Sequence, residues 1–227
     1  QKFGKVATMM PKPISMDSGS GMHTNVSLWK NDQNSFFDEA SELELSQVGR
    51  YFCGGIMSHA KALTAITNPT TNSYHRLVPG YEAPVYIAWS SSNRSATIRI
   101  PAHFKGQKYA FMKRLEYRVP DPASNPYLVF SAVLAAGLDG IKKKMDPGDP
   151  VQEDIYKMSR SERKKRGIDT LPANLGRALD ELESDRKFLS PIFSTPVLDK
   201  IIDLERRDQR EISIRPHPHE FYLYFDV

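Results

Sequence analysis

The chain has 227 residues, of which 40% are hydrophobic and 26% are charged, and its mean hydropathy is -0.49. This composition is typical of a globular protein and excludes a disordered or collagen-like chain. The 31 Lys and Arg residues exceed the 27 Asp and Glu residues only slightly, which leaves a net charge of +4. A dedicated nucleic-acid-binding protein is therefore not indicated.

The single cysteine, Cys53, cannot form an internal disulfide and lies in an apolar helical stretch. It is predicted to be a buried core residue in a reducing compartment. No run approaches the roughly 18 apolar residues of a membrane span, and the first residues carry no signal-peptide pattern. We expect a cytoplasmic protein that binds neither membranes nor nucleic acid.

The first predicted elements are a long helix and three short strands. Apolar residues recur every three or four positions from Glu42 to Thr67, which predicts a helix. It should end at Asn68, because Pro69 disfavours helical geometry in the residue before it, and a loop is expected over residues 70–73. Three β-like runs follow, over residues 84–90, 95–101 and 114–119.

The remainder is predicted to be mainly helical. Asn125 and Pro126 mark the start of a helix that runs to about Lys144 and is apolar nearly all round, as expected for the centre of a core. In the polar segment over about 146–172, the basic run 160–166 has no interleaved aromatic residues, so a solvated loop is favoured over a nucleic-acid site. Helices are expected near 174–188 and 195–210, and an edge strand over 220–227.

Alternation along two of the predicted strands separates polar from apolar faces. Glu116 and Arg118 share one face of the third run, while Thr97 and Arg99 share one face of the second, with Arg94 just ahead of it. If the strands share a sheet, three arginines and a carboxylate meet on one surface. Such a surface suits phosphate and carboxylate oxygens and a bridging cation. An ordinary polar face with Arg–Glu pairs is an equally good interpretation.

Two loops and a histidine pair are further candidates. Arg76 and Glu82 flank Gly80 in a loop that either presents both to a ligand or pairs them with each other. The glycine-bearing stretch 17–25 offers His23 as a metal ligand, although a lone histidine is more often structural. His217 and His219 are expected on opposite faces of a strand and are interpreted as structural.

Several separated motifs carry a family resemblance. They are Gly19-Ser20-Gly21-Met22-His23, residues 68–74, residues 76–84, Asn93-Arg94 through Pro101, Glu116-Tyr117-Arg118, Pro120-Asp121-Pro122, Asn125-Pro126-Tyr127 and residues 216–221. In order and approximate spacing the chain resembles the catalytic domain of glutamine synthetase, most closely the bacterial and archaeal class I enzymes. The resemblance implies an α+β fold with an antiparallel-rich curved sheet and flanking helices.

The resemblance also implies a reaction and its participants. Glutamine synthetases use ATP to phosphorylate the γ-carboxylate of L-glutamate, and ammonia then displaces phosphate to give L-glutamine. A divalent ion, Mg²⁺ or Mn²⁺, is expected to neutralise phosphate oxygens in this reaction. The implied metal ligands are His23 and Glu116; the implied ATP contacts are Asn25, Ser27, Arg94 and Arg99; the implied glutamate contacts are Gly19, Arg76 and Arg118; and the implied catalytic residues are Glu82, Arg94 and Arg118.

Some positions depart from the class I pattern. Ser18 stands where asparagine is usual, Asn25 where a second histidine is usual, and residues 102–108 are longer than the commonest form. Tyr156 aligns near a tyrosine that some bacterial enzymes adenylylate, but its neighbours differ. Because Ser18 is shorter, a γ-glutamyl ligase that uses an amine or polyamine is an alternative, as is a non-catalytic nucleotide-binding homologue.

The resemblance covers residues 1–227 but not the family's N-terminal β-grasp domain or the first part of its catalytic domain. We therefore interpret the chain as the C-terminal portion of the catalytic domain, inactive when isolated. The family relationship further implies a homo-oligomer, commonly a dodecamer, for the full-length protein.

Overall fold

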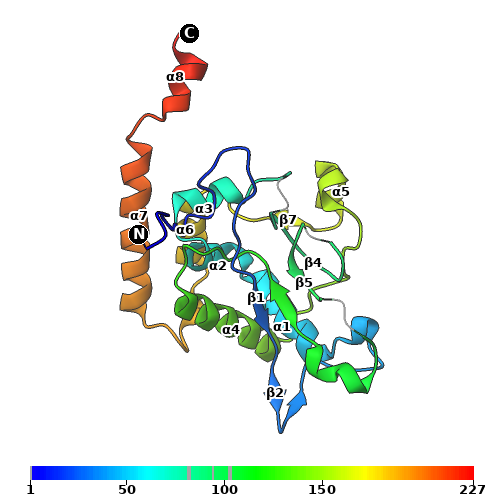
Figure 1. The fold of residues 1–227 in the computed structure, drawn as a ribbon. Coiled ribbons are helices and arrows are strands. Elements are labelled where there is room, and N and C mark those ends of the chain that lie inside the picture. The colour runs from blue at the N-terminus through cyan, green and yellow to red at the C-terminus, as the bar shows by residue number, and fades with distance from the viewer. Residues whose placement is uncertain (1, 81–82, 94, 102–103) are drawn as a thin grey trace.

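A five-stranded sheet forms the centre of the computed structural model, which describes residues 2–80, 83–93, 95–101 and 104–227 (Figure 1). Its strand order is β1-β6-β5-β4-β7. The strands are β1 (Thr24–Val26), β4 (Tyr86–Ser90), β5 (Ala96–Arg99), β6 (Leu115–Tyr117) and β7 (Asp169–Thr170), and a separate hairpin joins β2 (Trp29–Lys30) to β3 (Gln33–Asn34). Every pairing in the sheet is antiparallel except β4 with β5. The α+β fold expected from the sequence is confirmed.

The alternation predicted for the strands is present in the sheet. Ile98 on β5 and Tyr117 on β6 are register partners, and both are fully buried. The neighbouring partners Arg99 and Glu116 point to the opposite face because successive side chains alternate along a strand. One face of the sheet therefore belongs to the core, and the other carries the polar residues.

The predicted helix over 42–67 is two helices that meet at His59. Helix α1 (Gln47–Ser58) starts at Ser46, whose side chain accepts a hydrogen bond from the Gly49 amide, and α2 (Ala60–Thr67) ends before Asn68-Pro69 as expected. At His59 the backbone leaves helical geometry, with φ −99° and ψ 7°. The imidazole is buried between side chains distant in the sequence, so periodicity alone did not reveal the break.

Helix α4 (Pro126–Lys143) packs directly against α1, and glycines allow the close approach. A Cβ atom on Gly55 would lie 2.2 Å from the Ala136 carbonyl oxygen, and one on Gly140 would lie 2.3 Å from the Tyr51 carbonyl oxygen. Both distances are impossible for a real side chain, so the two backbones touch where glycine is present. Cys53 on α1 is fully buried, as predicted.

A short helix replaces the loop predicted for residues 70–73. Helix α3 (Thr71–Arg76) begins with a capping box, in which Thr70 and Ser73 each bond the other's backbone amide. Pro69 precedes this cap and does not oppose the helix, because the new helix starts after it. Arg76 is the last residue of α3, and it is buried.

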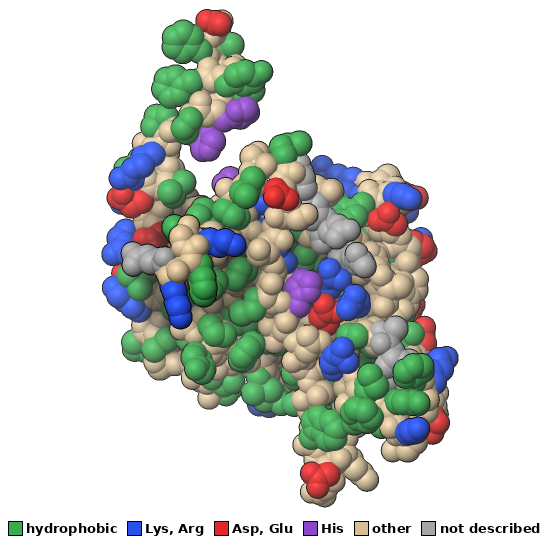
Figure 2. Space-filling view, in the orientation of Figure 1, with side chains coloured by type: hydrophobic (Ala, Val, Ile, Leu, Met, Phe, Trp, Pro, Cys, Tyr) green, Lys and Arg blue, Asp and Glu red, His purple; other side chains and the backbone are tan. Residues whose placement is uncertain are grey.

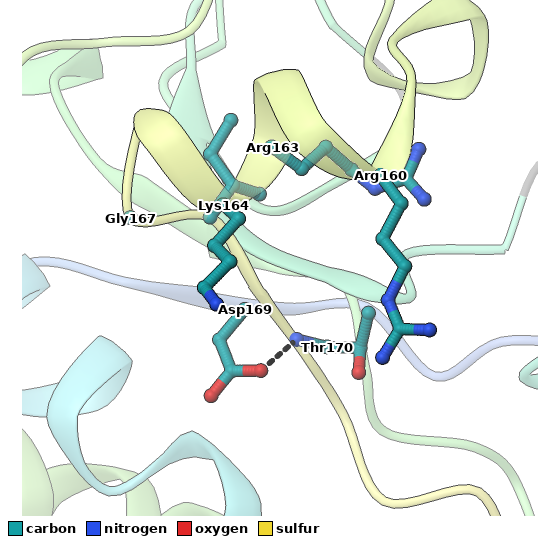
Figure 3. Close-up of a pocket in the computed structure, with 7 residues that line it drawn as sticks. Arg160, Arg163, Lys164, Gly167, Asp169 and Thr170 are labelled. Atoms are coloured by element: carbon teal, nitrogen blue, oxygen red, sulfur yellow. Dashed lines mark hydrogen bonds between the residues drawn. The ribbon is translucent and has the colours of Figure 1, made fainter.

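The polar segment 146–172 is more ordered than predicted. It contains α5 (Arg160–Lys165) in place of the expected loop, and its β7 pairs with β4. The capping box of Ser159 and Glu162 explains why α5 forms. The side chains of Arg160 and Lys164 point into a cavity of about 540 Å³ between α5 and β7 (Figure 3). Most residues of α5 are exposed, in agreement with a solvated segment.

The C-terminal part contains α6 (Leu175–Ser184), α7 (Thr195–Ser213) and α8 (Pro218–Tyr224). The first two were predicted, but α8 contradicts the expected edge strand. His217 caps α8 by accepting a hydrogen bond from the His219 amide, and Pro218 occupies its first turn. Figure 1 shows α8 projecting beyond the body of the molecule. Since none of the described strands pairs with this segment, the alternating sequence forms local helical hydrogen bonds instead.

Short 3₁₀ helices complete the fold, at Glu42–Glu44, Gln107–Met112, Ile155–Lys157 and Lys187–Leu189. Within the described residues, no helix is long and apolar enough to cross a membrane.

Candidate functional site

Three neighbouring strands place Asn25, Glu116 and Arg99 in one row across the sheet. Glu116 is the register partner of both Asn25 on β1 and Arg99 on β5. Arg99 Nε lies 2.6 Å from Glu116 Oε2, and His23, just before β1, places Nδ1 2.9 Å from Glu116 Oε1. The common surface of arginines and a carboxylate predicted from alternation is thus confirmed for Arg99 and Glu116. Figure 2 shows a histidine, an acidic group and basic groups gathered on this face.

The electrostatic surroundings of His23 keep its imidazole neutral. Burial lowers the pKa of His23, the charge of Arg118 lowers it further, and Glu116 acts in the opposite direction without reversing the shift. A carboxylate only accepts hydrogen bonds, so Nδ1 carries the proton that Glu116 binds, and Nε2 keeps a free lone pair. A Cβ on Gly21 would lie 2.9 Å from Nε2, so glycine leaves this nitrogen accessible.

His23 and Glu116 fit a divalent cation as part of a ligand set. Neutral imidazole and carboxylate are both metal donors. Glu116 Oε2 is buried and lacks a well-aligned hydrogen bond, since the Arg99 N–H does not point at it despite the short distance. Among the described residues, however, no group of three or more His, Cys, Asp or Glu side chains could hold a metal ion. These two residues would therefore supply only part of the ligand set of such a cation.

Arg76 lies beneath the glycine loop and donates to the backbone at the end of β6. Its Nη1 atom bonds the Val119 carbonyl at 2.7 Å, and its Nη2 atom bonds the Arg118 carbonyl at 3.1 Å. A Cβ on Gly19 would lie 2.9 Å from Arg76 Cγ, which shows how closely the loop covers it. Burial lowers the pKa of Arg76 to about 10, so it remains charged at neutral pH.

Arg118 extends the polar face beyond Glu116. Its side chain is buried and its backbone amide bonds the Thr97 carbonyl at 2.9 Å, which ties the end of β6 to β5. The structure thus brings the predicted residues Gly19, His23, Arg76, Arg99, Glu116 and Arg118 into one region. Glu82 and Arg94 lie outside the described residues.

Two of the predicted nucleotide contacts, Asn25 and Ser27, lie on β1 and just after it, while Arg99 is on β5. Asn25 is exposed and accepts a hydrogen bond from Arg114 Nε at 2.9 Å, while Ser27 accepts one from Trp29 Nε1 at 2.9 Å. Sequence reasoning missed Arg114. The alternation along 114–119 already placed it on the same face as Glu116 and Arg118, so the signal was available. A pocket of about 250 Å³ beside His23 and Asn25 is otherwise lined mainly by apolar residues of β1 and α4.

The polar segment 146–172 bonds residues that neighbour Glu82 and Arg94 in the sequence. Tyr156 Oη donates to the Ala83 carbonyl, and Asn93 Nδ2 donates to the Glu153 carbonyl at 2.5 Å. Segment 146–172 therefore holds Ala83 and Asn93, which neighbour Glu82 and Arg94 in the sequence. The larger cavity at α5 is separate: Asp169, which lines it, is paired with Lys61 at 2.5 Å, and it includes none of the predicted site residues.

Comparison with known proteins identifies the family. Residues 1–224 match the family described as glutamine synthetase, catalytic domain. The chain is 57% identical over 227 residues to a glutamine synthetase of Sulfolobus acidocaldarius, covering 99% of this chain and 48% of the relative. It is 48% identical over 229 residues to one of Streptomyces coelicolor, covering 100% and 48%.

Solved structures agree with this result. A glutamine synthetase of Plasmodium falciparum matches with a TM-score of 0.84 and 32% identity over 98% of this chain and 50% of that one. A structure named as a complex of GmaS with ADP matches with a TM-score of 0.83 and 35% identity, over 97% and 49%. The chain spans about half the length of the relatives it matches. Together, the matching sequences, the matching folds and the site around Glu116 show that this chain belongs to the glutamine synthetase catalytic-domain family.

Proposed function

We propose that this chain forms the C-terminal portion of the catalytic domain of an enzyme that joins ammonia to L-glutamate, using ATP, to give L-glutamine. The observation that carries the proposal is the cluster of His23, Glu116 and Arg99, with Arg76 and Arg118 beside it. It combines metal donors with buried cations, which is what phosphoryl transfer to a carboxylate requires.

The proposed reaction has two steps. A γ-carboxylate oxygen of glutamate bonds to the γ-phosphorus of ATP while the bond from that phosphorus to the ADP oxygen breaks. The nitrogen of ammonia then bonds to the acyl carbon of the γ-glutamyl phosphate, inorganic phosphate leaves with the electrons of the C–O bond, and the nitrogen loses one proton, which the departing phosphate takes up. Both steps develop or move negative charge, so fixed cations stabilise them more than the ground state.

Each residue has a proposed role. Glu116 and His23 Nε2 would hold a Mg²⁺ or Mn²⁺ ion, which would supply neutralisation of phosphate oxygens. Arg99 and Arg94 contact the phosphates, and Asn25 and Ser27 contact the nucleotide. Arg114 belongs with the nucleotide contacts because it donates a hydrogen bond to Asn25. Gly19, Arg76 and Arg118 bind glutamate, and Arg118 also contacts the transferred phosphoryl group. Glu82 excludes water and accepts the proton that ammonium loses.

The rest of the enzyme completes the site. The partial metal site and the half-length match both support further ligands from a segment outside this chain. A homo-oligomer, commonly a dodecamer in this family, is proposed for the full-length protein. The alternatives, an amine or polyamine ligase and a non-catalytic homologue, are less favoured because the curated relatives at 46–57% identity are named glutamine synthetases.

The test is formation of γ-glutamyl hydroxamate by the full-length protein from glutamate, hydroxylamine and ATP with Mg²⁺ or Mn²⁺. We expect product with either ion and none without ATP. Nucleotide binding without turnover would support the non-catalytic alternative, and faster turnover with an amine than with ammonia would support the amine ligase.

A variant tests the proton acceptor. Glu82→Ala should reduce glutamine formation on the order of 10²-fold or more, the usual size of a general-base contribution, with little change in ATP affinity. Turnover equal to that of the unaltered enzyme would remove Glu82 from the mechanism.

A further inference from the structure

A buried carboxylate lies behind the proposed glutamate-binding arginines. Asp121 follows β6 in the turn that leads to α4, and none of its surface is exposed. The mechanism above does not use it. Fully buried aspartates are rare because removing a carboxylate from water costs several kcal/mol unless other groups compensate. Compensating groups are therefore expected around Asp121.

A chain of hydrogen bonds links this carboxylate to Arg76. Asn68 Nδ2 donates to Asp121 Oδ2 at 2.9 Å and also to the Val119 carbonyl at 2.9 Å. The same carbonyl accepts the 2.7 Å bond from Arg76 Nη1. The other carboxylate oxygen, Oδ1, accepts from the Ala123 amide at 3.0 Å. Both oxygens are thus held in place, and the network ends on the guanidinium of Arg76.

The charges explain why a carboxylate is needed there. Arg76 is buried, forms no ion pair with any described residue, and is repelled by the charge of Arg118. Among the described residues, Asp121 supplies the attractive charge that acts on it. Three backbone carbonyls satisfy part of the guanidinium but do not neutralise it. A buried cation without a counter-charge is strongly disfavoured, so the two buried arginines would not be stable side by side alone.

We propose that Asp121 is a positioning residue: with Asn68 it provides the buried counter-charge that holds Arg76 in place to receive a carboxylate of glutamate. The proposal rests on the proposed function and deepens it. Asp121 is fully buried, so it acts on Arg76 without contacting substrate itself. Its effect should therefore fall on the glutamate site and not on the nucleotide site along β1.

The experiment compares variants of the full-length enzyme in the hydroxamate assay. Asp121→Asn keeps the shape and removes the charge, and we expect the KM for glutamate to rise about tenfold or more while the KM for ATP stays within about twofold. The control is Ser124→Ala, which removes the 2.6 Å bond from Ser124 Oγ to the Asp121 carbonyl but leaves the carboxylate intact. It should change neither KM beyond about twofold.

If Asp121→Asn does not fold, Asn68→Ser decides the question, because it breaks the link between the carboxylate and Val119 and keeps the charge. A rise in the glutamate KM of at least about threefold over Ser124→Ala, with the ATP KM unchanged, would support the proposal. Equal effects on both substrates, or an effect no larger than that of Ser124→Ala, would overturn it. Failure of the proposed function itself would appear separately, as an unaltered enzyme without any product.

Discussion

Two histidines, His23 and His59, show how the same side chain serves different ends in this molecule. His23 lies at the edge of the sheet beside one carboxylate and two arginines, and its pKa is lowered. His59 lies at the junction of α1 and α2, with Nδ1 2.6 Å from Asp185 and Nε2 3.0 Å from Asp139. Burial alone would lower its pKa, but the hydrogen bonds with Asp185 and Asp139 outweigh this and raise it.

The two rings differ in whether a nitrogen lone pair remains available for a ligand. Both nitrogens of His59 face carboxylates, which only accept, so the ring is a doubly donating imidazolium. It also stacks on Phe188 with ring centres 3.9 Å apart, and Lys143 pairs with Asp139 at 2.8 Å. His59 therefore joins α2, α4 and the end of α6 with no free lone pair. His23 keeps the lone pair of Nε2 available beside the Glu116 carboxylate, which suits metal binding.

The largest expected effect separates the two histidines by activity. His23→Ala in the full-length enzyme should lower kcat/KM on the order of 10² to 10³-fold, the size of loss seen when a transition-state charge contact is removed. The melting temperature should change little because the ring is partly exposed. Steady-state kinetics and calorimetry measure both. A fully active His23→Ala enzyme would show that this histidine is not part of the site.

The second expected effect concerns stability. His59→Gln leaves Asp139 and Asp185 without their shared cation, and we expect the free energy of unfolding to fall by about 2 to 3 kcal/mol. This is below the cost of breaking a fully buried pair because Asp185 is partly exposed. Urea denaturation measures it. The matched control, Lys143→Gln, removes the more exposed partner of Asp139 and should cost less than about 1 kcal/mol.

The smallest expected effect is the pH dependence of that stability. Because the pKa of folded His59 is raised above its ordinary value near 6.5, its stabilisation is fully present below pH 6.5 and is lost as pH rises through the folded pKa. Burial also raises the pKa of Glu205 from its ordinary value near 4.5 to about 9, so its contribution to stability likewise falls as pH rises between about 4.5 and 9. We measure the free energy of unfolding against pH for the unaltered protein and for His59→Gln. Subtracting the second profile from the first cancels the contribution of Glu205. A difference in unfolding free energy that grows as pH rises would contradict a raised pKa of His59.

The local patterns of the sequence predicted much of the fold. Helix α4 follows from its N-cap, its proline and a continuous apolar run, and the polar face of Arg99 and Glu116 follows from a period of two. Both patterns depend only on residues close together in the sequence, so they can be recognised without the tertiary structure. The prediction was wrong over residues 220–227, where alternation was taken for a strand, because a strand also needs a partner and the segment has none in the described structure.

Contacts between distant residues decided what the patterns could not. His59 meets partners 80 and 126 positions away, so the break between α1 and α2 was invisible locally. The bond network from Asp121 through Asn68 to Arg76 likewise joins segments about 50 residues apart. The sequence by itself determined the helices, the faces of the strands and the family resemblance. Only the tertiary structure decided that His59 is a structural cation with both nitrogens bonded and that His23 has a nitrogen available for a ligand. The reason is that a pKa depends on charges and burial that folding alone brings together.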